Sequence, residues 1–443
     1  MSLASFIKKM RDITRLDQGI NGDAQRIEQI TWMLFLKIYD DREYDWEALE
    51  HDYVSIIPDP CRWRNWADTG KALKGDDLIR FVDGMLLPTL KDLPIPPGCP
   101  LRKSIVKTVF TDIHNFMKDG VQLRQLLTEI NECDFNDPQE AHAFGSIYES
   151  ILKLLQSAGS SGEFYTPRAL TDFMARHVGL KLGDKVADFA CGTGGFLNSA
   201  RAWLEGQAKT NAQREILARS FHGTEKKPLP YLLCVTNLLL NGVDEPLIRY
   251  GNSLTKSTGD YTEADKFDVV LMNPPYGGSE QLTIQQNFPS NMRSAETADL
   301  FLILIMARLK ATGRAAVVIP DGFLFGGGNK TEIKRELLSN FNLHTIVRLP
   351  TSVFSPYTSI ATNVLFFDGN GPTKETWFYR VDMPEGYKHF SKTKPMLLEH
   401  LADLDAWWDK REPLEVNGSD KARKYSKEEL EALQYNFDLC GFA

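Results

Sequence analysis

Asn273-Pro274-Pro275-Tyr276 joins an amide, two rigid prolines and an aromatic ring directly after an apolar run. That run, residues 267–272, has adjacent valines and is typical of a strand buried on both faces. Pro274 fixes its own φ and drives Asn273 into an extended conformation, so the amide and the backbone carbonyls point in defined directions. Two acceptor oxygens beside a flat ring suit a planar base or amide that carries an amino group. A proline-rich turn without a ligand is the alternative for this motif alone.

A second motif places glycines between an apolar run and a helical stretch. It is Asp188-Phe189-Ala190-Cys191-Gly192-Thr193-Gly194-Gly195-Phe196. Glycines let a ligand approach the backbone, and a helix start presents free N–H groups. Leu197 stands where the dinucleotide fingerprint needs a third glycine, and no Gly-Lys-Ser/Thr is present for a triphosphate. The loop therefore favours a ligand with an amino group and a carboxylate, such as S-adenosylmethionine. A tight turn without a ligand is the alternative.

The elements that position these motifs alternate between strands and helices after residue 180. This alternation predicts a doubly wound, Rossmann-like α/β sheet with right-handed crossovers. The first and fourth strands of such a sheet are neighbours, so the glycine loop and Asn273 should lie side by side at its carboxyl edge. Glu225, at the end of the second strand, is placed to bind ribose hydroxyls, with a surface glutamate as the alternative. We expect strands at 185–190, 220–224, 247–250, 267–272, 314–319, 343–349 and 362–367, and helices near 195–205, 229–240, 299–310 and 330–339.

The region before the sheet has mainly helical signals. Apolar residues at 27, 30, 34 and 38 keep the helical period, and 105–117 and 147–155 look similar, with a proline-rich loop at 93–98. Small residues at 156–162 predict a hinge, after which Thr166 is either the N-cap of a helix with Pro167 at its first position or part of a ligand site. We therefore predict a helical N-terminal domain over 1–155, a catalytic domain over 156–385 and a partly helical tail over 386–443, which includes a capping box at Ser426 and Glu429.

Composition limits the class of protein. The chain has 443 residues and a net charge of −8, so any basic surface for nucleic acid must be local or lent by a partner. No signal peptide or run of membrane-spanning length is visible. The six cysteines contain no Cys-x-x-Cys, and His114 and His142 have no partner at metal-ligand spacing. These features predict a cytoplasmic protein with free thiols and no metal site.

On these motifs the chain resembles the S-adenosylmethionine-dependent amino-methyltransferases of DNA. It is more closely similar to the modification (methyltransferase) subunit of type I restriction-modification systems, over nearly its whole length. The resemblance is only weakly specific at Leu34-Phe35-Leu36-Lys37 and at Phe144-Gly145-Ser146-Ile147-Tyr148-Glu149. The two loop motifs are its specific part. The resemblance implies methylation of the exocyclic N6 amine of adenine in DNA, with S-adenosylmethionine as the cofactor.

The resemblance also implies roles for single residues. Asn252 stands where related enzymes often carry an Asp facing the cofactor's adenine, and an amide still supplies one acceptor. Phe354 resembles the aromatic that packs on the flipped base, with a core phenylalanine as the alternative. The implied cofactor contacts are Tyr165, Thr166, Asp188, Gly192, Thr193, Gly194, Gly195, Phe196, Glu225 and Asn252, and the implied acceptor-amine motif is Asn273, Pro274, Pro275 and Tyr276.

The mechanism expected for this site needs neither a metal nor a nucleophilic side chain. Asn273 Oδ1 and the Pro274 carbonyl would accept both N–H bonds of the amine and aim its lone pair at the methyl group. The base must first leave the duplex, and stacking on Tyr276 would offset part of that cost. Cytosine C5 methylation would instead need a cysteine nucleophile, and the one Pro-Cys pair, Pro60-Cys61, is far upstream.

The chain after Phe367 has no second basic domain large enough to read a DNA sequence. We therefore expect a separate specificity subunit, contacted by the helical domain and the tail. Two copies per complex are expected, while the subunit ratio and the presence of a restriction (nuclease and translocase) subunit stay open. The polar segment 277–297 is expected to be mobile without DNA. The alternatives are methylation of RNA or of a protein glutamine amide, and a non-catalytic assembly subunit.

Overall fold

The computed structural model describes residues 3–67, 73–135, 165–355 and 357–441. These residues divide into two compact units: the first holds those before residue 161 together with Gly192–Gly194 and Glu225–Tyr250, and the second holds the rest. The predicted helix at 147–155, the hinge at 156–162, the stretch 144–149 and His142 lie outside the described residues. The domain boundaries at 155 and 385 stay predictions.

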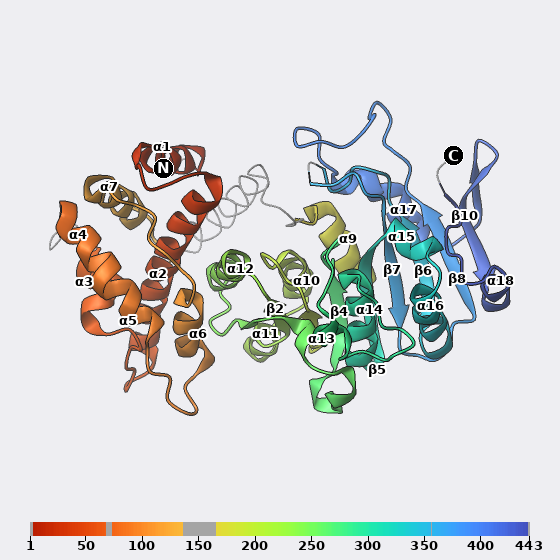
Figure 1. Ribbon diagram of the computed structural model, residues 1–443, viewed down its shortest axis with the longest axis horizontal. Helices are drawn as coiled ribbons and strands as arrows, with labels where there is room; N and C mark the ends of the chain where they lie inside the picture. The colour runs from red at the N-terminus through yellow and green to blue at the C-terminus, as the bar shows by residue number, and fades with distance from the viewer. Residues whose placement is uncertain (1–2, 68–72, 136–164, 356, 442–443) are drawn as a thin grey trace. The chain divides into compact units, whose positions relative to one another are not determined.

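The first unit is mainly helical, as the sequence predicts. The helix predicted around residues 27–38 is α2, and the loop at 93–98 is confirmed. The helix predicted at 105–117 is too long, because the backbone of 116–119 bonds to side chains instead: Gln29 accepts from Phe116 N, and Asp17 accepts from Lys118 N and Asp119 N. Its elements are α1 (Leu3–Leu16), α2 (Asp23–Leu49), η1 (Asp59–Cys61), α3 (Trp63–Trp66), α4 (Gly75–Phe81), η2 (Val82–Leu86), α5 (Leu87–Lys91), α6 (Leu101–Phe110), α7 (Gly120–Asn131), α12 (Pro228–Leu240) and β3 (Leu247–Tyr250) (Figure 1).

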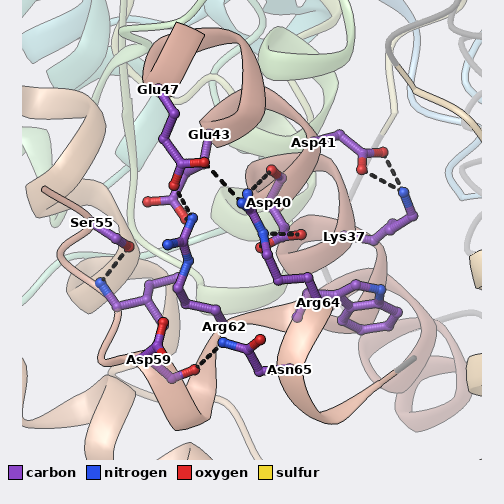
Figure 2. Close-up of polar contacts among 12 residues, drawn as sticks. Lys37, Asp40, Asp41, Glu43, Glu47, Ser55, Asp59, Arg62, Arg64 and Asn65 are labelled. Atoms are coloured by element: carbon purple, nitrogen blue, oxygen red, sulfur yellow. Dashed lines mark hydrogen bonds and ion pairs between the residues drawn. The ribbon is translucent and has the colours of Figure 1, made fainter. Parts of the chain in front are cut away.

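A cluster of ion pairs joins α2 to the segment around α3 (Figure 2). Arg64 Nε lies 3.0 Å from Asp40 Oδ1, and Arg64 Nη1 lies 2.9 Å from Glu47 Oε2. Arg62 binds the other oxygen of Glu47 and lies 3.4 Å from Glu43 Oε2, whose side chain is fully buried. Because each carboxylate has a guanidinium partner, the cluster offsets the cost of burying charge between these elements.

The second unit is built on the predicted sheet, which continues further than the sequence indicates. The ten strands have the order β3-β2-β1-β4-β5-β7-β6-β8-β10-β9. β2, β1, β4 and β5 are parallel neighbours, whereas β7 runs antiparallel between β5 and β6. The strands of the second unit are β1 (Val186–Asp188), β2 (Phe221–Glu225), β4 (Phe267–Met272), β5 (Leu309–Pro320), β6 (Asn342–Arg348), β7 (Thr362–Asp368), β8 (Glu375–Arg380), β9 (Leu414–Val416) and β10 (Ser419–Ser426).

The seven predicted strands and the four predicted helices of this region are confirmed. Ser426 forms the predicted capping box with Glu429 at α18. The tail also supplies β9 and β10, and β10 pairs antiparallel with β8, so the tail extends the sheet. The remaining elements are α9 (Arg168–His177), α10 (Gly195–Glu205), α11 (Asn211–Ala218), η3 (Ser253–Thr255), η4 (Thr258–Asp260), η5 (Glu263–Asp265), α13 (Leu282–Gln285), α14 (Thr297–Arg308), α15 (Asp321–Phe325), α16 (Asn329–Asn340), η6 (Leu398–Leu401), α17 (Ala402–Trp408) and α18 (Lys427–Ala432).

Helices cover both faces of this sheet, because successive side chains of a strand point to opposite sides. Leu365 and Phe367 of β7 join the core formed by α14 and α16. Phe366, between them, packs edge-on against Phe173 of α9 and Trp408 of α17. The continuous apolar run of α14 is thus explained by burial on several sides, as its sequence suggests.

The segment 277–297 is folded onto the second unit. Ser279 forms a β-bridge with Glu296, and the segment contains the short helix α13. Phe288 and Met292 are 3% and 7% exposed and belong to the core around α14. This packing contradicts the expectation of a mobile segment, because two apolar anchors offset the polar composition on which that expectation rests.

Candidate active site

The two loop motifs follow neighbouring strands. β1 pairs in parallel with β4, with Val186 opposite Val269 and Ala187 opposite Val270. Asn273 is the residue after β4, and the glycine loop is the connection from β1 to α10. The strand order reverses at this pair, since β2 lies on one side and β5 on the other. This is the switch point at which ligands bind in open α/β sheets.

The Asn273 amide is held at both of its polar atoms. Its Nδ2 donates to Thr166 Oγ1 at 3.0 Å, and its Oδ1 accepts from the Tyr276 hydroxyl. The prediction that Thr166 is an N-cap is wrong: α9 begins at Arg168, Pro167 occupies the cap position, and no side chain caps the helix. Thr166 instead accepts the hydrogen bond from Asn273. The sequence could not indicate this contact, because 107 positions separate the two residues.

The rings of Tyr276 and Phe354 meet edge to face beside this amide. Their centroids lie 5.9 Å apart with an interplanar angle of 83°. Both side chains are buried, at 7% and 1% exposure. Burial raises the pKa of Tyr276 well above its ordinary value, and the hydrogen bond to Asn273 opposes that rise only in part. The Tyr276 hydroxyl therefore stays protonated and acts as a hydrogen-bond donor.

The glycine loop adopts a conformation that explains its composition. Gly192 and Gly194 have φ values of +53° and +82°, which only glycine adopts without strain. The Gly192 N–H donates to Glu225 Oε2 at 2.8 Å, and the Lys227 N–H donates to Oε1 at 2.8 Å. Glu225 is thus a buried carboxylate that fixes the loop, and the reading as a mere surface glutamate is wrong.

The remaining predicted residues lie on the same loops or next to them. Asp188 is buried and accepts from the Ala190 N–H at 3.1 Å, while Thr193 and Phe196 are also buried. Asn252 Oδ1 accepts from the Leu254 N–H at 3.0 Å, so part of its acceptor capacity caps η3.

Three residues outside the predicted set also support these loops. Ser253 Oγ donates to the Phe189 carbonyl at 2.7 Å, and Asn287 Nδ2 donates to the Leu254 carbonyl at 2.9 Å. The Tyr357 ring lies 6.0 Å from that of Tyr165, centroid to centroid. Ser253 directly follows the predicted Asn252, and Tyr357 lies three residues after the predicted Phe354, whereas no local pattern marks Asn287.

The donor groups fit S-adenosylmethionine better than a phosphate or a metal ion. Each Glu225 oxygen accepts a backbone N–H, and apart from the neighbouring residues of the chain no heavy atom lies within 4 Å of a Cβ built on Gly192. The start of α10 adds N–H groups that suit a carboxylate. Across the ranges with described coordinates, no group of three or more His, Cys, Asp or Glu is placed to hold a metal ion.

Comparisons with known proteins agree over the whole chain. The profile of the N-6 DNA methylase family matches residues 139–441, and that of the HsdM N-terminal domain matches residues 3–130. The type I restriction enzyme EcoEI methylase subunit of Escherichia coli is 47% identical over 443 residues, covering 99% of this chain and 90% of its own length.

Solved structures show the same likeness. The crystal structure of a modification subunit from Vibrio vulnificus YJ016 has a TM-score of 0.84 and 43% identity, covering 97% of this chain and 92% of that one. A chain from a type I R-M system studied for complex assembly has a TM-score of 0.87 and 36% identity, covering 98% and 89%.

Proposed function

The chain belongs to the N-6 DNA methylase family, as the methylase subunits of type I restriction enzymes do, and from this membership we propose how its residues carry out the reaction. It transfers a methyl group from S-adenosylmethionine to the exocyclic N6 amine of adenine in DNA. When bound, the cofactor supplies an electrophilic methyl group on a sulfonium. The parallel pairing of β1 with β4 carries the proposal, because it brings the donor loop and the acceptor amide to one edge.

The acceptor side works by hydrogen bonding and orientation. Asn273 Oδ1 and the Pro274 carbonyl accept the two N–H bonds of the amine, which draws the nitrogen towards tetrahedral geometry and directs its lone pair. The Asn273 oxygen already accepts from Tyr276, so the incoming amine replaces that hydrogen bond. The Tyr276 ring then stacks on the extruded base and Phe354 packs on the other face, which requires the two rings, now in edge-to-face contact, to move apart.

The donor side holds the cofactor through the loops after β1 and β2. Glu225 binds the ribose hydroxyls, and Asp188 with the loop Gly192–Gly195 and Phe196 holds the methionine part. Tyr165 and Thr166 contact the same part, and Asn252 faces the adenine. These roles are supported by the burial of the two carboxylates and by the positive φ of two loop glycines.

Substitution of Asn273 by Ala tests the acceptor role. The chain assembled with its partner subunits is incubated with labelled S-adenosylmethionine and DNA, and methyl transfer should fall by about a hundredfold or more, as when one preorganised hydrogen bond is removed from an active site. Calorimetry should show cofactor binding close to that of the wild type, since Asn273 lies on the acceptor side. Asn340→Ala, on the exposed end of α16, is the matched control. Normal methyl transfer by Asn273→Ala would refute the mechanism.

The partners follow from the family. We propose that sequence recognition comes from a separate specificity subunit, contacted by the helical domain and the tail, and that the complex holds two copies of this chain. The presence of a restriction subunit stays open. The described residues contain no helix long and apolar enough to cross a membrane. DNA as substrate and six cysteines without a disulfide support a place in the cytoplasm. If RNA or a protein glutamine were labelled in preference to DNA, the substrate assignment would be wrong.

A further inference from the structure

Phe325 is an exposed aromatic side chain at the carboxyl edge of the sheet. β5 pairs in parallel with β4, with Met272 opposite Val317, and it ends at Pro320. The five-residue helix α15 follows at once and ends at Phe325. The Phe325 side chain is 58% exposed, whereas Phe323 and Leu324 are 2% and 0% exposed. The strand that leads into this helix, β5, thus lies beside β4, which Asn273 follows, on the side of β4 away from β1.

A buried cation holds the backbone on both sides of this ring. Lys334 of α16 is 1% exposed, and its Nζ donates to the carbonyls of Leu324 and Gly326 at 2.9 Å each. The Phe437 N–H donates to the same Leu324 carbonyl at 2.9 Å. Burial of the ammonium is costly and lowers the pKa of Lys334 to about 8, with the charge of Lys330 adding to the effect. The carbonyls of the residues before and after Phe325 are therefore both held by one buried ammonium.

The start of α15 and the turn after it are fixed as well. Asp321 Oδ1 accepts from Arg348 Nη2 at 2.9 Å and from Asn363 Nδ2 at 3.1 Å. A Cβ on Gly326 would lie 2.3 Å from Lys330 Cδ and 2.8 Å from the Gly322 carbonyl, so no side chain fits there. Single exposed apolar residues are ordinary on protein surfaces. Phe325 differs from such residues because buried charged groups hold both ends of the short helix that carries it.

We propose that the Phe325 ring stacks on a DNA base next to the site of the extruded adenine. The inference rests on the proposed function and adds a DNA contact to it. Removing a base from the duplex exposes the faces of its neighbours, and an aromatic ring on a rigid element replaces the lost stacking. Such a contact tolerates any sequence, since every base has a flat face. It also needs no positive charge, which suits a chain with a net charge of −8.

Substitutions of Phe325 in the assembled complex test the contact. Phe325→Ala should raise the KM for DNA by about tenfold, within the range given by the loss of one base–aromatic stack. Phe325→Trp should keep the wild-type value, and Phe325→Leu should behave like Ala, because leucine is apolar but has no π face. The KM for S-adenosylmethionine should stay unchanged in all three. The matched control is Ile216→Ala, which removes a 50% exposed apolar side chain from α11, before the amino end of β2.

The outcomes separate this inference from the proposed function. An unchanged DNA KM in Phe325→Ala overturns the contact, and so does a Leu variant that behaves like the wild type. Loss of complex assembly by Phe325→Ala, measured by size-exclusion chromatography, would assign the ring to a subunit interface and also overturn it. If the wild-type complex fails to methylate DNA, the proposed function itself fails, whatever Phe325 does.

Discussion

Among single residues, the chain of contacts Thr166–Asn273–Tyr276 decides how the acceptor amide points. An amide has a donor end and an acceptor end of nearly equal size, so its orientation follows from its partners. The Thr166 oxygen takes the Nδ2 donor, which leaves Oδ1 facing Tyr276 and the place of the incoming amine. We therefore propose that Thr166 acts on the reaction through Asn273, in addition to the cofactor contact proposed for it.

Replacing Thr166 by Val tests this orientation. Valine has nearly the same shape but cannot accept the Nδ2 hydrogen bond, so the amide loses its preferred rotamer. We expect the single-turnover rate of methyl transfer at saturating cofactor to fall about tenfold, which matches the loss of one hydrogen bond of ~1.4 kcal/mol. Thr166→Ser should restore the rate, because the hydroxyl is kept. A Val variant that loses only cofactor affinity, with its saturated rate intact, would leave Thr166 no part in orienting the amide.

Among the elements, α2 and α3 of the first unit depend on the ion pairs in Figure 2. The side chain of Arg64 is 18% exposed and that of Asp40 is 5% exposed, so removal of the guanidinium leaves a largely buried carboxylate without this ion-pair partner. Arg64→Ala should reduce the free energy of unfolding of this unit by roughly 3 kcal/mol, measured by urea unfolding. Arg80→Ala, which breaks a pair with Asp77 at 76% and 67% exposure, should change it by less than about 0.5 kcal/mol. Equal effects of the two substitutions would contradict this account.

A residue of α2, Glu28, also makes the stability of the fold depend on pH. Burial raises the pKa of Glu28 to about 7, although the His114 N–H and Lys91 oppose the rise. The folded state therefore keeps a proton that the unfolded chain releases near pH 4.5, and this stabilisation is lost as the pH rises from about 4.5 through 7. Glu28→Gln keeps the neutral form at every pH. The difference in Tm between this variant and the wild type, by calorimetry, should grow in favour of the variant from pH 5 to pH 7.5, and a constant difference would exclude the effect.

The same elements show how far sequence reasoning reaches. Strands such as β4 and β7 are predictable because they are apolar runs that are largely buried in the sheet. β10 is not, because Ser419–Ser426 is rich in charge and becomes a strand only by pairing with β8. Asn273 and the glycine loop are recognisable from local patterns. The contacts of Thr166 and Glu225 are not, since each joins residues that are distant in sequence.

At the scale of the whole molecule, net charge sets what the chain can do alone. A charge of −8 opposes binding to DNA, whose affinity for proteins comes largely from neutralised phosphates. The purified chain should therefore bind S-adenosylmethionine in calorimetry but methylate DNA at least a hundredfold more slowly than the complex at about 0.15 M salt. Adding the specificity subunit should restore the rate. Site-specific methylation by the chain alone would remove the need for that subunit.

The strand order reverses between β1 and β4, and this reversal separates the residues proposed to hold the methyl donor from those proposed to present the amine. In the proposed mechanism, residues at the ends of β1, β2 and β3 hold most of the methyl donor, and the residues after β4 present the amine. Tyr165 and Thr166, which precede β1, also contact the donor. Evolution can therefore rework the recipient of the methyl group while the donor half stays as it is. A chimera designed to methylate a different amine should therefore join its two parent sequences at this boundary between β1 and β4.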